Sequence, residues 1–371
     1  MATIAGGMPF VTRYEACRAV LRDIESFSNA SGFKAPGVVI PPEDRLLGEL
    51  DPPRHTLVRR VVVTALTPRV VHEAEAFMAE TARRLLDAIP VPGTADLVPA
   101  FTVSLPNQVT VHLLGLPAGD ADQLAVWAKE LMESGFPATN RSERGVGFAA
   151  AFPDFAGYID DQVARIEAHP EADHVLARLV FLESDGERLP RRQVRALVRN
   201  LITGGLTTTS QLLGNLVLRV LTDPSVEDAM RSNDAALTGA IEESLRLAPP
   251  VLFIFRGCVH ATQIAGRDMT EGERVVVGTG SANRDEQVFA DGATFDPTRE
   301  NADQHLTFGY GQHVCPGAAL ARTVARVGLT TFFERFPAGT VRLAEGFRFE
   351  NVPTFFEVGP RRLPIETRPA G

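Results

Sequence analysis

The stretch that most constrains the fold is a cysteine in a glycine-rich segment, placed directly before a helical pattern. Residues 308–317 read Phe-Gly-Tyr-Gly-Gln-His-Val-Cys-Pro-Gly, so Cys315 has His313 two residues upstream. Backbone N–H groups and a nearby helix N-terminus stabilise a thiolate, and glycines let the backbone close around the sulfur. No second cysteine stands at zinc or iron–sulfur spacing, but one thiolate can hold a single iron when a macrocycle supplies the other ligands. The segment favours Cys315 as the axial ligand of a haem; the alternative is a buried thiol in a tight turn.

Length and charge exclude several classes of protein. The chain has 371 residues, 44% of them hydrophobic and 22% charged, which is typical of a globular protein with a large core. Its net charge of −9 argues against nucleic-acid binding. No apolar run approaches the ~20 residues of a membrane span, and the N-terminus lacks the pattern of a secretory signal. Three scattered cysteines do not form a disulfide framework. We therefore expect one domain over residues 1–371, located in the cytoplasm.

Helical patterns dominate the chain between residues 69 and about 185, and the longest one covers residues 191–222. In its middle, residues 203–210 read Thr-Gly-Gly-Leu-Thr-Thr-Thr-Ser. Adjacent glycines and a run of hydroxyl side chains weaken a helix and favour a local bulge or kink. Such a kink is either a packing feature of a buried helix or a place where a hydroxyl holds water beside a ligand. A strand–turn–strand pattern follows, through residue 277.

Three polar features outside the cysteine segment have competing explanations. His55 and Arg59 lie four residues apart, on one face of a helix that begins after two prolines. They could form a solvated face or a binding wall. Glu243 and Arg246 can pair three residues apart on a helix, usually as surface charges. Arg256 ends an apolar extended run and is predicted to be an inward-facing cation that needs a partner.

Residues 308–317 strongly resemble the cysteine loop of the cytochrome P450 family. The His-x-x-x-Arg segment, the hydroxyl-rich helix and the Glu-x-x-Arg pair stand in the order that the family shows, and the resemblance runs from about residue 9 to 366. It implies a mainly α fold, the cytochrome P450 fold, in which a helical haem-binding core is accompanied by a minor β-rich lobe.

The resemblance also implies roles for individual residues around haem b. Cys315 would ligate the iron, and Glu243 with Arg246 would form a structural ion pair. Thr208 would be the proton-relay threonine, together with Thr207. The remaining cofactor-binding residues would be His55, Arg59, Gly205, Arg256, Phe308, His313 and Gly317. The substrate pocket would be lined by Leu252, Phe253, Ile254 and Phe355, although these apolar residues equally suit a core. The 31–50 loop and the 120–165 helices would form the pocket roof.

Two departures from the family pattern stand out. Thr207 occupies the position at which the family normally carries an acid, and a neutral hydroxyl cannot shuttle protons through a carboxylate. Only nine residues precede the segment that resembles the family's start, so either the start is misassigned or truncated, or the first sheet lacks a strand, which would expose an edge. The first departure bears on chemistry and the second on the fold.

The resemblance implies a monooxygenase that inserts one oxygen atom from O2 into an apolar small molecule. A cysteine thiolate donates electron density that favours O–O cleavage. No dinucleotide or flavin fingerprint occurs in the chain, so a separate ferredoxin or flavoprotein would deliver electrons. Arg322 and Arg326, after the cysteine, would attract an acidic donor or form an ordinary solvated face. Thr207 also favours peroxide-driven or other haem-thiolate chemistry, and a non-catalytic haem- or ligand-binding paralogue is the rival from another class.

Overall fold

The computed structural model describes residues 2–3, 7–30, 40–134 and 147–370. Residues 31–39 of the predicted pocket loop, and residues 135–146 of the predicted pocket roof, lie outside the described residues. None of the described helices is both long enough and apolar enough to cross a lipid bilayer.

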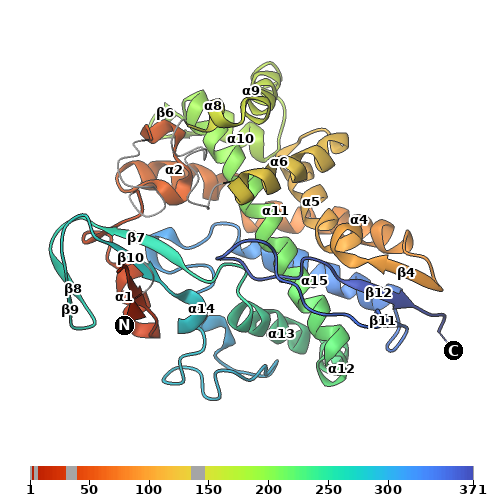
Figure 1. The fold of residues 1–371 in the computed structure, drawn as a ribbon. Coiled ribbons are helices and arrows are strands. Elements are labelled where there is room, and N and C mark those ends of the chain that lie inside the picture. The colour runs from red at the N-terminus through yellow and green to blue at the C-terminus, as the bar shows by residue number, and fades with distance from the viewer. Residues whose placement is uncertain (1, 4–6, 31–39, 135–146, 371) are drawn as a thin grey trace.

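Helices make up most of the described chain, as predicted, and pack around one long central helix (Figure 1). They are α1 (Tyr14–Arg22), α2 (Arg54–Ala65), α3 (Pro68–Glu73), α4 (Glu75–Asp87), α5 (Ser104–Leu114), α6 (Ala121–Ser134), α8 (Phe148–Ala151), α9 (Pro153–Glu167), α10 (Val175–Phe181), α11 (Arg191–Thr222), α12 (Pro224–Ser232), α13 (Asp234–Leu247), α14 (Thr279–Ala282) and α15 (Ala318–Arg335). The short turns used below are η1 (Pro42–Asp44), η2 (Leu47–Glu49), the π-turn η3 (Val98–Thr102) and η6 (Gly311–His313).

Side-chain caps fix several helix starts, because the first N–H groups of a helix lack partners within it. The Thr67 hydroxyl accepts from the backbone at the start of α3. Asp223 caps α12 in the same way, and Asn233 caps α13. Helix α5 ends at Gly115, whose φ of +69° is a left-handed conformation that suits glycine.

The five-stranded sheet and the three-stranded sheet lie on opposite sides of α11 in Figure 1. Among the described residues, the larger sheet has the order β1-β2-β10-β7-β3, in which β2 and β10 run parallel. A smaller sheet has the order β11-β12-β4, and two hairpins pair β5 with β6 and β8 with β9. The strands are β1 (Ala2–Thr3), β2 (Pro9–Val11), β3 (Phe27–Ser28), β4 (Gly93–Asp96), β5 (Glu183–Ser184), β6 (Glu187–Arg188), β7 (Ile254–Cys258), β8 (Thr262–Ile264), β9 (Arg267–Met269), β10 (Arg274–Val277), β11 (Val341–Leu343) and β12 (Pro364–Thr367). The predicted β-rich minor lobe is confirmed, and β1 pairs with β2 at one edge of its sheet.

Helix α11 lies in the main hydrophobic core and contacts α5, α6, α9 and α15. Leu213, Leu216 and Val217 on this helix are fully buried. A second cluster of buried apolar residues joins α1 to the larger sheet. The core therefore holds α11 and α15 side by side, with the cysteine segment leading into α15.

The predicted bulge or kink at residues 203–210 does not interrupt α11, which is α-helical throughout. Its hydroxyl groups donate to carbonyl oxygens four residues earlier: Thr203 to Arg199, Thr208 to Gly204 and Ser210 to Leu206, at 2.6–2.9 Å. These bonds satisfy the hydroxyls within the helix. Bonds of this kind slightly destabilise a helix, but α11 continues through them.

Candidate active site

The cysteine segment folds as a compact turn that ends at α15. Gly309 and Gly311 have φ of +77° and +74°, which non-glycine residues rarely adopt. The backbone N–H of Cys315 donates to the Phe308 carbonyl at 2.8 Å and closes the turn. A Cβ on Gly311 would lie 3.3 Å from the Leu21 carbonyl oxygen, so the turn also packs tightly against α1.

Cys315 lines a cavity of about 260 Å³ between α2, α5, α11 and the start of α15. The cysteine is free, and its accessible surface belongs to this cavity. Burial raises the pKa of the Cys315 thiol, whereas a backbone hydrogen bond from Gly317 and the guanidinium groups of Arg59 and Arg322 lower it. A bound metal cation would complete the stabilisation of a thiolate, because metal binding requires the deprotonated form.

One wall of the cavity carries polar side chains that have no partner among the described residues. The rings of His55 and His313 lie 4.0 Å apart between centroids, and both are buried or partly buried. Neither ring nitrogen of His55, nor Nδ1 of His313, makes a hydrogen bond within the described chain. Burial, followed by the nearby Arg59, lowers the pKa of His55 to about 4. Burial and the neighbouring His55, together with Arg256 and Arg59, lower the pKa of His313 to about 3.

These orphaned nitrogens fit a group that brings its own carboxylates. Arg59 lines the same wall, and its guanidinium donates to the Val314 carbonyl at 2.8 Å. Two propionates would give the buried imidazoles and the guanidinium the anionic acceptors that they lack. The donor set and Cys315 together fit a haem at this site.

Arg256 lies next to this wall, on β7, and is 4% exposed. It donates to the neighbouring Phe255 carbonyl, and burial lowers its pKa to about 10 although Asp51 favours its charge. Asp51 is already bound by the Ser28 hydroxyl and the Asn29 backbone. Arg256 is therefore the inward-facing cation that the sequence predicted.

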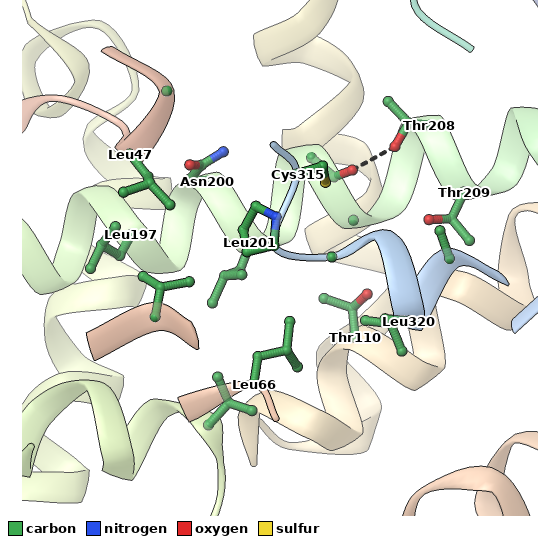
Figure 2. Close-up of a pocket in the computed structure, with 18 of the residues that line it drawn as sticks. Leu47, Leu66, Thr110, Leu197, Asn200, Leu201, Thr208, Thr209, Cys315 and Leu320 are labelled. Carbon is green, nitrogen blue, oxygen red and sulfur yellow. Dashed lines mark hydrogen bonds between the residues drawn. The ribbon is translucent and has the colours of Figure 1, made fainter. Parts of the chain in front are cut away.

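The opposite wall is formed by α11. Thr208, Gly205 and Gly204 line the cavity, and Figure 2 shows Thr208 donating to the Gly204 carbonyl while Thr110 approaches from α5. A Cβ on Gly205 would lie 3.3 Å from the Thr110 hydroxyl oxygen, so glycine allows α5 and α11 to approach here. Thr207 is not among the lining residues; its hydroxyl lies 3.4 Å from Glu357 on another flank of α11.

The structure brings eight predicted residues to this cavity: His55, Arg59, Gly205, Thr208, Phe308, His313, Cys315 and Gly317. The apolar lining that the sequence did not single out includes Leu47, Leu66, Leu113, Leu114, Val175, Leu197 and Leu201. Their helical spacing signals burial, and burial alone does not separate a cavity wall from a core.

The predicted substrate-pocket residues lie apart from the described lining of this cavity. Phe253 contacts Phe355 with ring centroids 5.6 Å apart, and Phe355 is 56% exposed. Leu252 accepts the Gly280 N–H through its carbonyl, and Ile254 begins β7. Their role in binding a substrate stays a prediction.

The Glu-x-x-Arg pair is fully buried. Arg246 donates to the Glu243 carboxylate at 2.7 and 2.9 Å, and Arg299 donates to the other oxygen. Arg246 also binds the carbonyls of Asn283, Gly292 and Thr294. The cluster ties α13 to the segment that leads to the cysteine turn.

The arginines after Cys315 are paired. Arg322 binds Glu242 through two bonds of 2.6 and 2.8 Å, and Arg326 binds Glu75 at 2.7 Å. Both remain partly exposed. Much of the charge of the predicted basic patch is thus balanced by carboxylates of α13 and α4.

Comparison with known proteins agrees with this arrangement. Residues 155–344 match the family model described as Cytochrome P450. The erythromycin C-12 hydroxylase of Saccharopolyspora erythraea is 32% identical over 97% of this chain and 89% of that protein. The cyclomarin C epoxidase CymV of Salinispora arenicola is 33% identical over 87% of this chain and 80% of that protein.

The fold matches solved structures equally well. A mutant of P450 EryK in complex with erythromycin B superposes with a TM-score of 0.89 at 30% identity, covering all of this chain and 93% of that one. HmtN, a post-tailoring hydroxylase involved in himastatin biosynthesis, gives a TM-score of 0.85 at 29% identity, covering 99% of this chain and 93% of that one. With a cysteine turn that faces an imidazole- and guanidinium-lined cavity, the chain belongs to the cytochrome P450 family of bacteria and is a haem-dependent monooxygenase.

Proposed function

We propose that the protein inserts one oxygen atom from O2 into an apolar small molecule, with haem b held by Cys315 and electrons supplied by a separate ferredoxin or flavoprotein. The observation that carries the proposal is that Cys315 lines a cavity with apolar walls, beside imidazole nitrogens of His55 and His313 that have no hydrogen-bond partner in the described chain. Haem iron with a thiolate ligand supplies the oxygen activation. The chain's own residues bind the group, exclude water and position polar atoms.

His55, Arg59, Arg256 and His313 would hold the two propionates. Their buried nitrogens lack anionic partners in the described chain, and carboxylates satisfy such donors at low cost. Phe308, Gly205 and Gly317 would contact the macrocycle by shape, since they line the cavity without a charged group. Thr208 would position water opposite the sulfur.

The substrate class follows from the apolar walls and from the relatives. The relatives are named for oxidation of erythromycin and cyclomarin C, which favours a natural product of similar character here. Leu252, Phe253, Ile254 and Phe355 would supply further contacts. A screen for ligand-induced shifts of the haem spin state, across macrolides, cyclic peptides, terpenes and fatty acids, would identify the class. The buried free thiols Cys17 and Cys258 also fit a reducing compartment such as the cytoplasm.

The reduced carbon monoxide spectrum tests the ligand assignment. The wild type should show the red-shifted band of a thiolate-ligated haem, and Cys315→Ser should abolish it. Cys258→Ser, which alters a buried thiol of β7 that is not among the residues lining the cavity, is the matched control and should leave the band unchanged. A wild type without the band would show that the protein does not bind haem through a thiolate, and the proposed function would be wrong.

A second candidate function is peroxide-driven or other haem-thiolate chemistry that does not need the acid relay. The neutral Thr207 favours it, because the family's acid is absent from that position. Product formation should be compared with a ferredoxin system and with peroxide. Near-zero coupling with the first and good rates with the second would favour this candidate over the monooxygenase.

A further inference from the structure

Helix α11 separates two cavities. Thr208 lines the one that contains Cys315, and Thr207 lines a second cavity of about 360 Å³ between α11, α6 and the 352–361 segment. Consecutive residues of an α-helix point about 100° apart, so neighbouring hydroxyls can serve different flanks. The second cavity holds a carboxyl group, that of Glu357.

Glu357 is 2% exposed and is held by uncharged groups in the described chain. The Thr207 hydroxyl lies 3.4 Å from its Oε1, while the Gln211 amide and the Thr354 hydroxyl donate to Oε2 at 3.2 and 3.3 Å. Lys129 of α6 and Arg361 of the same segment also line the cavity. A carboxyl group buried among uncharged partners is better suited to carry a proton than to carry a permanent charge.

The direction of the Glu357 pKa agrees with this geometry. Burial raises it, and the hydrogen bonds from Gln211, Thr354 and Thr207 offset only part of the rise. The Thr207 hydroxyl is placed between two acceptors, the Glu357 carboxyl and the Thr203 carbonyl at 3.2 Å. A hydroxyl both donates and accepts, so it can take up one proton while it releases another.

We propose that Glu357 supplies, from the C-terminal segment, the carboxyl group that α11 lacks at position 207. The inference rests on the monooxygenase function proposed above. Glu357 gives its proton to the Thr207 oxygen, which releases its own proton through water towards Thr208 and the Cys315 cavity. The carboxylate then regains a proton from water in the second cavity. No electrons move in this relay, and Glu357 acts through Thr207 as a positioning and proton-supplying residue.

Glu357→Gln is the first test, because glutamine keeps the size of the side chain and one acceptor oxygen but cannot ionise. The rate of product formation should fall about 100-fold, which lies in the range for a removed general acid, and product formed per electron pair should fall with it. The solvent deuterium isotope effect should rise, while the substrate-induced spin shift stays unchanged. Glu350→Gln, which alters an exposed carboxylate two residues before this segment, is the matched control and should behave as wild type.

Two further variants locate the relay. Thr207→Val breaks the contact to Glu357 and should reproduce the defect of Glu357→Gln, and the double variant should be no worse than either. Thr207→Asp combined with Glu357→Gln returns an acid to α11 and should restore most of the coupling. If Glu357→Gln does not fold, Thr207→Val carries the test.

The carboxyl can also be read without turnover. Infrared difference titration should show a protonated carboxyl band that persists above the ordinary range of glutamate and is absent from Glu357→Gln. Product formation should fall as the pH rises through this titration, since the protonated acid is the donor. A wild type that has the thiolate band, with unchanged coupling and isotope effect in Glu357→Gln, would overturn the relay alone. A wild type without the band would overturn the proposed function and the relay with it.

Discussion

The two walls of the Cys315 cavity are built in different ways. In the cysteine wall, the 308–317 segment has its geometry set locally by the glycines at 309 and 311 and by the Cys315-to-Phe308 bond, and α2 adds His55 and Arg59. The α11 wall is one flank of a long helix, and on its other flank, outside this cavity, Thr207 meets Glu357, 150 residues away. Substitutions behind or within the cysteine wall are therefore expected to lower the free energy of unfolding. On α11, polar side chains can be replaced, and the chemistry changed, while the helix stays intact.

The largest stability effect is expected behind the cysteine wall. Glu243→Gln would leave the guanidinium groups of Arg246 and Arg299 buried without their carboxylate, which costs about 3–5 kcal/mol of unfolding free energy. Urea unfolding followed by circular dichroism measures it. Glu183→Gln, from the exposed pair with Arg188, is the control and should cost less than about 1 kcal/mol. An equal loss in both variants would contradict the assignment of a buried scaffold.

A second effect on the same side depends on pH. Burial raises the pKa of Glu242, but hydrogen bonds from Arg322 and His305 outweigh it and lower the value to about 2. The stability from this carboxylate is complete above its unfolded pKa of about 4.5 and is lost as the pH falls from there towards about 2. Glu242→Gln should therefore remove on the order of 3 kcal/mol at about pH 7 and much less at about pH 3.

The measurement is the urea midpoint of both proteins across this pH range. If the difference between wild type and Glu242→Gln stays constant with pH, the ion pair with Arg322 makes no pH-dependent contribution to the free energy of unfolding. Glu345→Gln, an exposed carboxylate after β11, is a suitable control, and its difference should stay small throughout.

Gly311→Ala tests the local geometry of the cysteine turn. A φ of +74° costs a non-glycine residue about 1–2 kcal/mol, and the new methyl would press on the Leu21 carbonyl. Thermal unfolding should show the loss, and haem retention should fall with it. Gly119→Ala, where a Cβ meets open space, should leave both unchanged. A variant at 311 that matches wild type would mean that the turn relaxes freely.

The smallest stability effect is expected on the α11 wall, with the clearest effect on chemistry. Thr208→Val removes a hydroxyl that donates within its own helix, so the unfolding free energy should change by about 0.5 kcal/mol or less. Product formed per electron pair should nevertheless fall, because water near Thr208 loses a partner. Thr222→Val removes a similar hydroxyl near the end of α11 and should leave coupling intact. Equal coupling in both variants would argue against a role for Thr208.

The contrast between the walls also explains what the sequence could predict. Cys315, His55 and Arg59 belong to short motifs in which local helix and turn geometry places the side chains, and the structure brings them to one cavity. Glu357 belongs to no motif. Its meeting with Thr207 depends on how the C-terminal segment packs on α11, which no spacing within either segment reveals.

Helix periodicity could have separated two residues that the sequence treated together. Thr207 and Thr208 were both expected beside the haem, yet neighbours on a continuous α-helix diverge by about 100°. The expected bulge would have relaxed this constraint, and α11 is regular instead. The predicted substrate-pocket residues were limited by a different problem. Phe253 and Phe355 pack on each other, and hydrophobicity alone does not distinguish such a contact from the wall of a substrate pocket.

The close approach of Gly205 to Thr110 has a consequence for engineering the substrate range. A methyl group at 205 would lie 3.3 Å from the Thr110 hydroxyl oxygen, so the Thr110 side chain would have to yield slightly, and a larger residue at 205 would press harder on it. Residues 110 and 205 therefore behave as one coupled design variable. A combinatorial library that enlarges residue 205 should therefore vary residue 110 in the same clone.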